Sequence, residues 1–319
     1  MIPLVSISCA TYNHGRFIRQ CLDGFLIQKV NFPIEILVHD DASVDGTAEI
    51  IKEYANKYPQ VIKPLCQTEN QFSRGINVTL TYNFSRAEGK YIALCEGDDY
   101  WTDSYKLQRQ VDFLENNPEF SLACGGFIKR IVNSGEEYID VIDDYKLFPI
   151  RRDGGFEFSL NDLHKKWLTK TLTVIFRKDF LNTDDLFRFK YLRDTHLFHQ
   201  LIKKGKGFYF TEPFGVYHVH QGGIHSTKIG SERADIAYEM HKELYEIVGD
   251  NYSKRKLYEK SMKKLAHESS SRYAIRHFLT LSFRAMGLAD SFFEIIKVFK
   301  LIFKKLFSFF IKKENNKVV

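Results

Sequence analysis

The sequence predicts an α/β fold in which a mixed, mainly parallel sheet is flanked by helices and followed by a helical C-terminal extension. Apolar runs rich in β-branched residues alternate with segments of helical period over the first 130 residues. Polar clusters follow three of these runs, and from about residue 230 the pattern is wholly helical. Such an alternation is typical of parallel strands joined by right-handed helical crossovers.

Each element is expected from its own pattern. The expected strands cover residues 4–10, 34–40, 61–67, 90–96 and 120–128, and the expected helices cover 15–28, 46–58, 75–87 and 105–117. Asp45 is placed to cap the second helix, whereas Pro64 in the third strand indicates a sheet edge or a bulge. Residues 133–165 are polar and irregular and are expected to form a loop. After them we expect a strand entering a helix at 171–181, a helix at 193–206 and two short strands within 207–223.

Composition restricts the class of protein. The chain has 319 residues with 44% hydrophobic and 27% charged residues, as in an ordinary globular protein. Its net charge of +6 is too mild to indicate nucleic acid as a partner. Five cysteines without a CxxC pair are typical of a reducing compartment. The N-terminus lacks the basic region and the long apolar run of a signal peptide, and no uncharged apolar run reaches 18 residues.

The pattern predicts three regions: a main domain at 1–225, a helical region at 226–290 and a basic amphipathic segment at 291–319. In the last region four lysines fall near one helical face, and Phe, Ile and Leu fill the rest; they are Lys297, Lys300, Lys304 and Lys312. This pattern favours attachment to an anionic membrane surface, with a core helix or a dimer contact as alternatives. We therefore expect a cytoplasmic protein that is peripheral on the inner face of the cell membrane.

The stretch "ALCEGDDYWTD" crowds carboxylates where a strand ends. Ligands bind at the carboxyl ends of the strands in such sheets. Gly97 lets the backbone turn sharply, so that Glu96, Asp98 and Asp99 need not point apart. Converging carboxylates suit Mg²⁺ or Mn²⁺, which also retain phosphate oxygens as ligands. The alternative is an exposed turn in which the carboxylates are separately hydrated.

Other polar clusters offer further candidates, each with an ordinary structural alternative. Asp41 follows the second strand and could bind a base, a ribose or a metal, or simply form a turn. Tyr12 could stack on a nucleobase or pack against the fold. Asp194 could be a general base or a helix N-cap. His218 and His220, on one face of a strand, could meet a metal or a diphosphate, or be satisfied by hydrogen bonds in the core.

In this order, "SISCATYNHGRFIRQCLDGFLIQ", "EILVHDDASVDGT", "GKYIALCEGDDYW" and "YHVHQGG" resemble the motifs of glycosyltransferase family 2, the inverting transferases of the GT-A fold, over about residues 3–225. The resemblance implies a nucleotide-sugar donor, usually a UDP-sugar, and a divalent cation. It also implies roles for single residues, listed here: Tyr12 stacks on the base, Asp41 reads the uracil, Glu96 and Asp98 occupy the D-x-D positions, Asp98 and Asp99 hold the cation, Asp194 is the catalytic base, and His220 lies near the diphosphate and metal. Glutamate in place of the first aspartate makes the ribose contact uncertain, and the match around Arg74, which would face the diphosphate, is loose.

The resulting hypothesis is a metal-dependent, inverting sugar transferase acting on a glycan or lipid-linked acceptor in surface polysaccharide biosynthesis. Acceptor choice is expected to depend on the loop at 133–165 and on the surroundings of Trp167. A sugar-nucleotide nucleotidyltransferase is an alternative, although "ATYNHGRFI" has a single glycine where such enzymes carry a Gly-rich loop. A glycoside hydrolase would place its two carboxylates further apart than Glu96 and Asp99. A non-catalytic nucleotide-sugar-binding scaffold is the remaining alternative.

Overall fold

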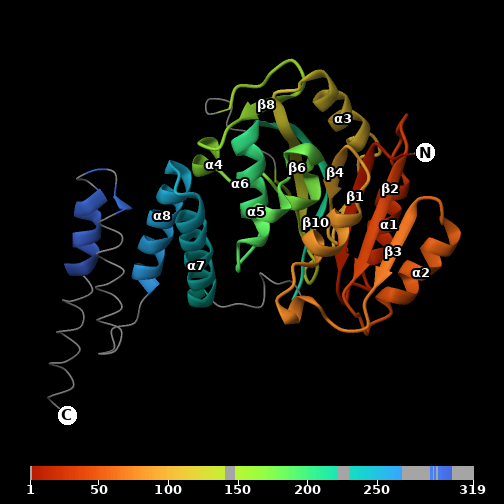
Figure 1. Ribbon diagram of the computed structural model, residues 1–319, viewed down its shortest axis with the longest axis horizontal. Coiled ribbons are helices and arrows are strands. Elements are labelled where there is room, and N and C mark those ends of the chain that lie inside the picture. The colour runs from red at the N-terminus through yellow and green to blue at the C-terminus, as the bar shows by residue number, and fades with distance from the viewer. Residues whose placement is uncertain are drawn as a thin grey trace, which may run out of the picture. The chain divides into compact units, whose positions relative to one another are not determined.

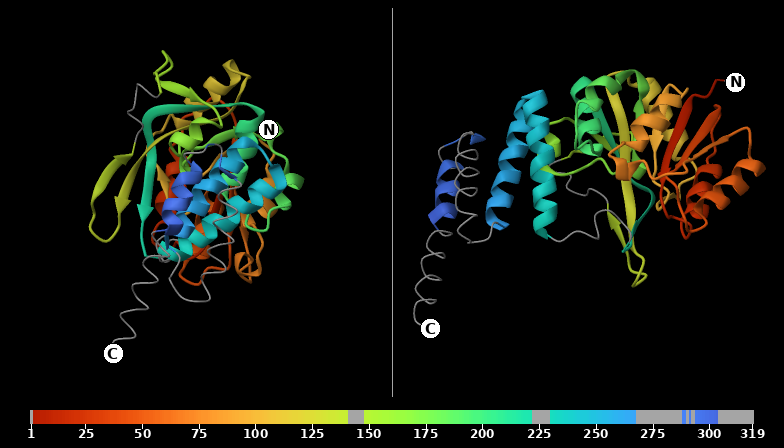
Figure 2. Two further views of the ribbon diagram at one scale, coloured as in Figure 1. Left: turned by 90° about the vertical axis from the view of Figure 1, so that its left-hand side faces the viewer. Right: turned by 60° about the horizontal axis from the view of Figure 1, so that its bottom comes forward.

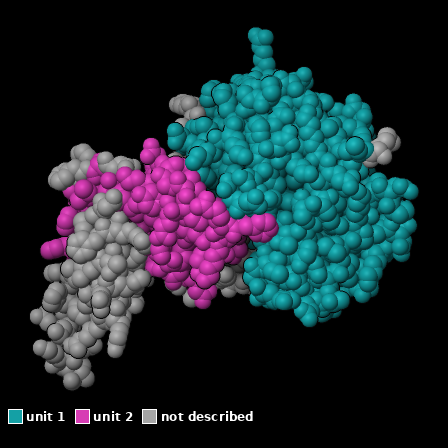
Figure 3. Space-filling model, in the orientation of Figure 1, with its two compact units in different colours: residues 1–186, 194–221 teal, residues 187–193, 222–319 magenta. Residues whose placement is uncertain are grey.

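The computed structural model describes residues 2–140, 148–221 and 230–267, together with 288, 289, 291 and 294–303. The chain divides into two compact units, shown in two colours in Figure 3. The first comprises residues 1–186 and 194–221, and the second comprises 187–193 and 222–319. The predicted boundary at residue 225 falls between the described ranges, and the separate segment at 291–319 stays a prediction.

A mixed sheet organises the first unit, with strand order β3-β2-β1-β4-β9-β6-β10-β5 (Figure 1). The strands are β1 (Val5–Thr11), β2 (Ile34–Asp40), β3 (Ile62–Cys66), β4 (Tyr91–Leu94), β5 (Tyr100–Trp101), β6 (Phe120–Ile131), β7 (Glu137–Asp140), β8 (Gly155–Phe158), β9 (Ile175–Arg177) and β10 (Lys206–Val219). Parallel pairing joins β3, β2, β1 and β4, and also β6 and β10. β9 lies antiparallel between β4 and β6, and this arrangement confirms the predicted mixed, mainly parallel α/β fold.

Four helices of the first unit pack against strands of the sheet: α1 (Ile18–Leu26), α2 (Thr47–Lys57), α3 (Lys106–Asn116) and α6 (Asp194–Lys204). Two short helices, α4 (Asp162–Lys165) and α5 (Thr183–Phe187), precede α6 in the chain, and the second unit contains α7 (Gly230–Val248) and α8 (Asn251–His267). In α1, Cys21, Leu22 and Phe25 recur at helical spacing and are fully buried. Asp45 lies before α2, where its carboxylate accepts hydrogen bonds from the backbone N–H and the hydroxyl of Thr47.

The helix expected at about 75–87 is present in a shorter and irregular form. A π-helical turn at Thr79–Asn83 continues into a 3₁₀ turn at Phe84–Arg86, and a separate 3₁₀ turn at Phe72–Arg74 precedes them. Asparagine side chains compete here for backbone partners: Asn77 Oδ1 accepts the N–H of Leu80, and Asn83 Nδ2 donates to the carbonyl of Cys9 at 3.1 Å. These side-chain hydrogen bonds, one of which joins Asn83 to β1, accompany the departure from regular α-helical geometry.

Two further expectations differ from the structure. The predicted pair of strands within 207–223 is one strand, β10, whose register with β6 shifts on both sides of Pro213. Proline has no N–H to donate to the ladder, so the strand bulges there without ending. The stretch at 133–165, expected to be irregular, contains β7, β8 and α4 among its described residues. Figure 2 shows β6 continuing into a hairpin with β7.

Lys106 is a fully buried lysine in the core of this unit. Its Nζ lies 4.1 Å from the centroid of the Trp101 ring and donates to Gln110 Oε1 at 2.8 Å. Burial lowers the pKa of Lys106 from 10.5 to about 7. Between these two values the unfolded chain binds more protons than the folded chain, so this lysine makes folding more favourable as the pH rises.

We therefore expect the stability of the wild type to rise relative to a Lys106→Met variant between pH 7 and pH 9. The slope is up to about 1.4 kcal/mol per pH unit. Urea denaturation of both proteins across this pH range measures the difference between their free energies of unfolding. The titration of the groups that both proteins share cancels in this difference. A difference that does not change with pH would show that Lys106 keeps an ordinary pKa in the fold.

The second unit has its own small core. Tyr238, Leu257, Tyr258, Leu288 and Val298 are buried together. Helices α7 and α8 pack on each other, and residues 294–303 are helical. Within the described ranges, no helix combines the length and the apolar character that a bilayer-spanning segment needs.

Candidate active site at the carboxyl ends of the strands

Three predicted site segments meet at one edge of the sheet because they follow parallel neighbours. Tyr12 follows β1, Asp41 follows β2, and the 96–99 turn follows β4. Backbone hydrogen bonds join these segments: Asp41 N donates to the carbonyl of Thr11 at 3.0 Å, and Gly97 N donates to that of Ala10 at 3.0 Å. The sheet thus brings together residues that are about 85 positions apart in the chain.

The loops at this edge are held in unusual backbone conformations. Asn13 and Ala42 have positive φ angles of 55° and 63°. For a non-glycine residue such a conformation costs of order 1 kcal/mol, and it persists only where surrounding contacts enforce it. Here Asn13 N donates to Ser43 Oγ, and Asn13 Oδ1 accepts from Val44 N. The loops after β1 and β2 are therefore fastened to each other.

Gly97 permits the close approach of the acidic turn to β1. A Cβ atom at this position would lie 2.7 Å from the side chain of Thr11 and 3.1 Å from His14 Nδ1. Any side chain there would push the turn away from the loop that carries Tyr12. Glycine is thus required by packing as well as by turn geometry.

Asp98 is the centre of the site. His220 Nε2 lies 3.1 Å from Asp98 Oδ2, and His14 Nε2 lies 3.7 Å from the same oxygen. His218 Nδ1 donates to the Asp98 carbonyl oxygen at 2.6 Å. The rings of His218 and His220 both pack against Phe17, which places them on one side, as strand alternation predicts.

Burial alone would raise the pKa of Asp98, but the hydrogen bond from His220 and the nearby histidines lower it. The neighbouring Asp99 behaves in the opposite way. Its side chain is 2% exposed, and burial together with the charges of Asp98 and Glu96 raises its pKa. Asp99 Oδ1 accepts the backbone N–H of His218 at 2.9 Å and so ties the turn to β10. Asp98 is therefore the ionised member of the pair.

These residues fit a divalent cation that is shared with a phosphate. Asp98 Oδ1 is buried without a hydrogen-bond partner, which is unusual for a carboxylate oxygen and suits a cation ligand. Over the described ranges, no group of three or more His, Cys, Asp or Glu side chains is arranged to hold a metal alone. Mg²⁺ and Mn²⁺ in nucleotide sites typically use one or two protein ligands and complete their shell with phosphates and water. Asp98 and His220 can supply that number, whereas metal ligation by Asp99 stays a prediction.

Glu96 adds a third carboxyl group to the turn. The residue keeps an exposed surface, but loss of hydration at its carboxyl and the charges of Asp98 and Asp194 raise its pKa to about 7. The influence of Asp194 places that residue within electrostatic range of the turn. Asp194 is exposed at the first position of α6, and its Oδ1 accepts the N–H of Thr195 at 2.8 Å. The role of Asp194 as the catalytic base stays a prediction.

The remaining predicted residues, Tyr12, Asp41 and Arg74, lie in the loops that follow β1, β2 and β3. Tyr12 is 45% exposed. Asp41 is buried, and its two carboxylate oxygens accept the backbone N–H groups of Gln71 and Phe72. Arg74 is exposed in the same loop and pairs with Glu69 at 3.1 Å. The contact of Asp41 with uracil and that of Arg74 with a diphosphate stay predictions.

Sequence reasoning missed His14. His14 lies in "TYNHG", the polar cluster that follows the first strand. Its position at the carboxyl end of a strand could have indicated a site residue. Its Nδ1 is buried without a hydrogen-bond partner, and burial lowers its pKa. Its ring is perpendicular to that of His220, with the centroids 6.2 Å apart. The acidic turn is therefore flanked by histidines from both β1 and β10.

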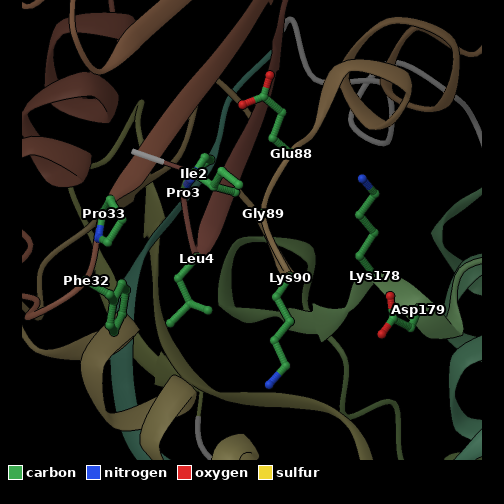
Figure 4. Close-up of a pocket in the computed structure, with 10 residues that line it drawn as sticks. All are labelled: Ile2, Pro3, Leu4, Phe32, Pro33, Glu88, Gly89, Lys90, Lys178 and Asp179. Atoms are coloured by element: carbon green, nitrogen blue, oxygen red, sulfur yellow. The ribbon is translucent and has the colours of Figure 1, made fainter.

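A cavity of about 600 Å³ lies elsewhere (Figure 4). Its lining includes Leu4, Pro33 and Lys90, which directly precede β1, β2 and β4. These are the amino ends of the strands, opposite to the edge that carries Asp98. The cavity is therefore not part of the acidic constellation.

Comparison with known proteins identifies relatives and structural neighbours of the chain. The chain is 35% identical over 222 residues to the protein Rv1520 of Mycobacterium tuberculosis, an alignment that covers 69% of this chain and 60% of that protein. The chain thus spans less than two thirds of this relative's length. TarS 1–349 of S. aureus, solved in complex with UDP, superposes with a TM-score of 0.59 at 17% identity and covers 90% of this chain and 81% of that chain.

The mannosyltransferase PcManGT from Pyrobaculum calidifontis, solved in complex with GDP-Man and Mn²⁺, superposes with a TM-score of 0.51 at 17% identity, covering 97% of this chain and 88% of that chain. These two likenesses concern the fold, and they confirm the GT-A architecture that the resemblance implied. Residues 6–193 match the profile described as Glycosyl transferase family 2. Since that match spans more than half of the sequence, the chain belongs to glycosyltransferase family 2.

Proposed function

We propose that the protein is an inverting glycosyltransferase that moves a sugar from a nucleotide-sugar, foremost a UDP-sugar, to a hydroxyl of a glycan or lipid-linked acceptor in surface polysaccharide biosynthesis. The observation that carries this proposal is the constellation around Asp98. A carboxylate with one unpartnered buried oxygen, two histidines and a separate exposed carboxylate, Asp194, lie at the edge of the sheet where ligands bind.

The donor's nucleoside binds between the loops that follow β1 and β2. Tyr12 offers an exposed aromatic face for stacking on the base, an interaction that contributes about 1–3 kcal/mol per base in other proteins. The hydrogen bonds between Asn13, Ser43 and Val44 hold both loops in place before the donor arrives. TarS was solved in complex with UDP and PcManGT in complex with GDP-Man, which supports a nucleotide-sugar as the donor.

The diphosphate lies against the acidic turn. Asp98 and His220 would hold a Mn²⁺ or Mg²⁺ ion there, and this ion would neutralise the charge that develops on the leaving nucleoside diphosphate. His14 lies 3.7 Å from the same carboxylate, and Phe17 packs against the ring of His220. Asp99 anchors the turn to β10, so the turn keeps its position as the leaving group departs.

Asp194 is the general base. Its carboxylate stands exposed at the N-terminus of α6. It would take the proton of the acceptor hydroxyl as the oxygen attacks the anomeric carbon from the side opposite the diphosphate. One displacement of this kind inverts the anomeric configuration without a covalent sugar intermediate.

Incubation of the full chain with a panel of UDP-sugars and Mn²⁺ tests the proposal. We expect slow release of UDP from at least one donor, abolished by EDTA and restored by added Mn²⁺. The nucleotidyltransferase alternative predicts instead the release of pyrophosphate from a nucleoside triphosphate and a sugar phosphate. Binding of UDP-sugars without any turnover would favour the non-catalytic scaffold.

The C-terminal residues favour a membrane surface as an additional partner, with the protein cytoplasmic and peripheral. Within the helical stretch 294–303, Phe299 and Phe303 are 56% and 74% exposed, and Lys297 and Lys300 are also exposed. Aromatic rings beside lysines suit the interface of an anionic bilayer. Most of the predicted basic segment, including Lys304 and Lys312, lies outside the described residues.

We expect the full chain to float with vesicles containing 30% phosphatidylglycerol, a fraction of roughly one anionic lipid in three chosen to give a strong surface potential. It should not float with phosphatidylcholine vesicles. A Phe299→Ser/Phe303→Ser variant should bind the anionic vesicles more weakly. Equal flotation of the variant and the wild type would favour a protein contact for these residues.

A further inference from the structure

We propose that the acceptor carries a negatively charged group, a phosphate or a carboxylate, and that it binds on a surface made by Phe127, Lys129, Tyr138, Lys170 and Tyr217. We call this surface the lysine–tyrosine face. This inference rests on the proposed transferase function and names the class of acceptor for the same site. It arises from two lysines that the donor site does not use.

Strand register places four of these residues on one side of the sheet. Tyr217 of β10 lies opposite Lys129 of β6, and Lys129 lies opposite Tyr138 of β7. Phe127 is two positions from Lys129 on the same strand and therefore points to the same side. Its ring meets that of Tyr217 edge-on, with the centroids 6.0 Å apart. Asp140 pairs with Phe127 and therefore lies on the same side of the sheet. Among the described residues of β6, β7 and β10, it is the one carboxylate that the strand pairing places there.

Lys170 reaches this side from the segment before β9. Its Nζ lies 3.2 Å from the centroid of the Tyr217 ring and 5.9 Å from that of Phe127. The side chains of Lys129 and Lys170 are partly exposed. In the part of the chain that the structure describes, neither ammonium group forms an ion pair within 4.0 Å or a side-chain hydrogen bond. Lys170 thus stands over an aromatic ring, and both lysines have donor capacity to spare.

The lysine–tyrosine face adjoins the catalytic carboxylates. His218 and Tyr217 are adjacent on β10, so their side chains point to opposite sides: that of His218 packs on Phe17, beside Asp98. Helix α6, which begins with Asp194, packs against β6 and β10. Burial raises the pKa of Tyr217, and the charges of Asp99, Asp98, Glu96 and Asp194 raise it further. An acceptor on this face would therefore lie beside the proposed base.

The chemistry of the face fits an acidic sugar or a sugar phosphate better than a neutral sugar. The exposed surface of Tyr138, 52% accessible, offers an apolar plane for the C–H groups of a sugar ring. Ammonium groups bind phosphate and carboxylate oxygens through charge-assisted hydrogen bonds. The charges of Glu96 and Asp99 act on Lys170 but not on Lys129. A neutral acceptor would therefore leave Lys129 without a charged partner, whereas an anionic acceptor would supply one.

Binding measurements on the full chain test the inference. With the donor site filled by UDP and Mg²⁺, calorimetry compares three polymers: poly(glycerol phosphate), oligogalacturonate and neutral dextran oligosaccharide. We expect one anionic polymer to bind about tenfold or more tightly than dextran. Preference for the first or the second identifies phosphate or carboxylate as the recognised group.

Matched variants show where the anion binds. Lys129→Met/Lys170→Met should reduce the affinity for the anionic polymer by about tenfold or more, whereas Lys129→Arg/Lys170→Arg should retain it. Lys52→Met/Lys57→Met removes the same charge from exposed positions of α2 and should bind like the wild type. Melting temperatures verify that the variants are folded.

Three results would overturn the inference: equal affinity for dextran, no binding of either anionic polymer, or equal losses in the two methionine variants. Hydrolysis of UDP-sugars by the same preparation is measured in parallel. Hydrolysis without an anion preference contradicts only the assignment of the acceptor. Absence of hydrolysis with every donor contradicts the proposed function itself.

Discussion

An Asp194→Asn variant is expected to transfer sugar about 10²- to 10⁴-fold more slowly than the wild type, with unchanged affinity for UDP. The amide keeps the shape of the carboxylate and can still accept the N–H of Thr195, but it cannot take a proton. Because Asp194 is exposed and its bond to Thr195 is local, the fold should not be affected. Initial rates with saturating donor, together with calorimetry of UDP binding, measure both quantities.

Asp184 provides a matched control for this variant. It is an exposed aspartate in the first turn of α5, so Asp184→Asn removes the same charge from the first turn of another helix. Its activity should equal that of the wild type. If Asp194→Asn turned over substrate as fast as Asp184→Asn, another group would have to be the base.

The second large effect is expected at Asp98. Asp98→Asn should lower the affinity for Mn²⁺ in the presence of UDP and reduce transfer by about 10²- to 10³-fold. The variant removes the charge that faces His220 and His14, and it weakens the oxygen donor that the cation would use. Electron paramagnetic resonance of free Mn²⁺ reports the binding without reference to activity.

Asp99→Asn distinguishes the two adjacent aspartates. Its side-chain oxygen can still accept the N–H of His218, and burial already favours the uncharged form of Asp99. We therefore expect Asp99→Asn to retain most of the Mn²⁺ affinity that Asp98→Asn loses. The reverse order, or unchanged Mn²⁺ affinity in Asp98→Asn, would contradict the assignment of Asp98 as the principal ligand.

The local sequence pattern predicted best those strands and helices that are buried by a single neighbouring surface. Strand β2 has the predicted bounds of 34–40, and β1, β3, α2 and α3 differ from their predicted bounds by one residue at each end. Each is an apolar run or stripe that a single neighbouring surface buries, so its periodicity is visible in the sequence. Parallel neighbours then place Tyr12, Asp41 and Asp98 at one edge, and this consequence could also be predicted.

The sequence by itself determined the strand–helix alternation, the acidic turn at Gly97 and the order of the family motifs, because each depends on residues within a short window. The tertiary structure alone decided that β9 enters antiparallel between β4 and β6, that Pro213 bulges β10 instead of ending it, and that Asp98 faces His14 as well as His220. The placement of Lys170 against Tyr217 likewise depended on the fold. These features join positions that are tens of residues apart, and the free energy of such contacts comes from burial and charge in three dimensions, which no local periodicity records.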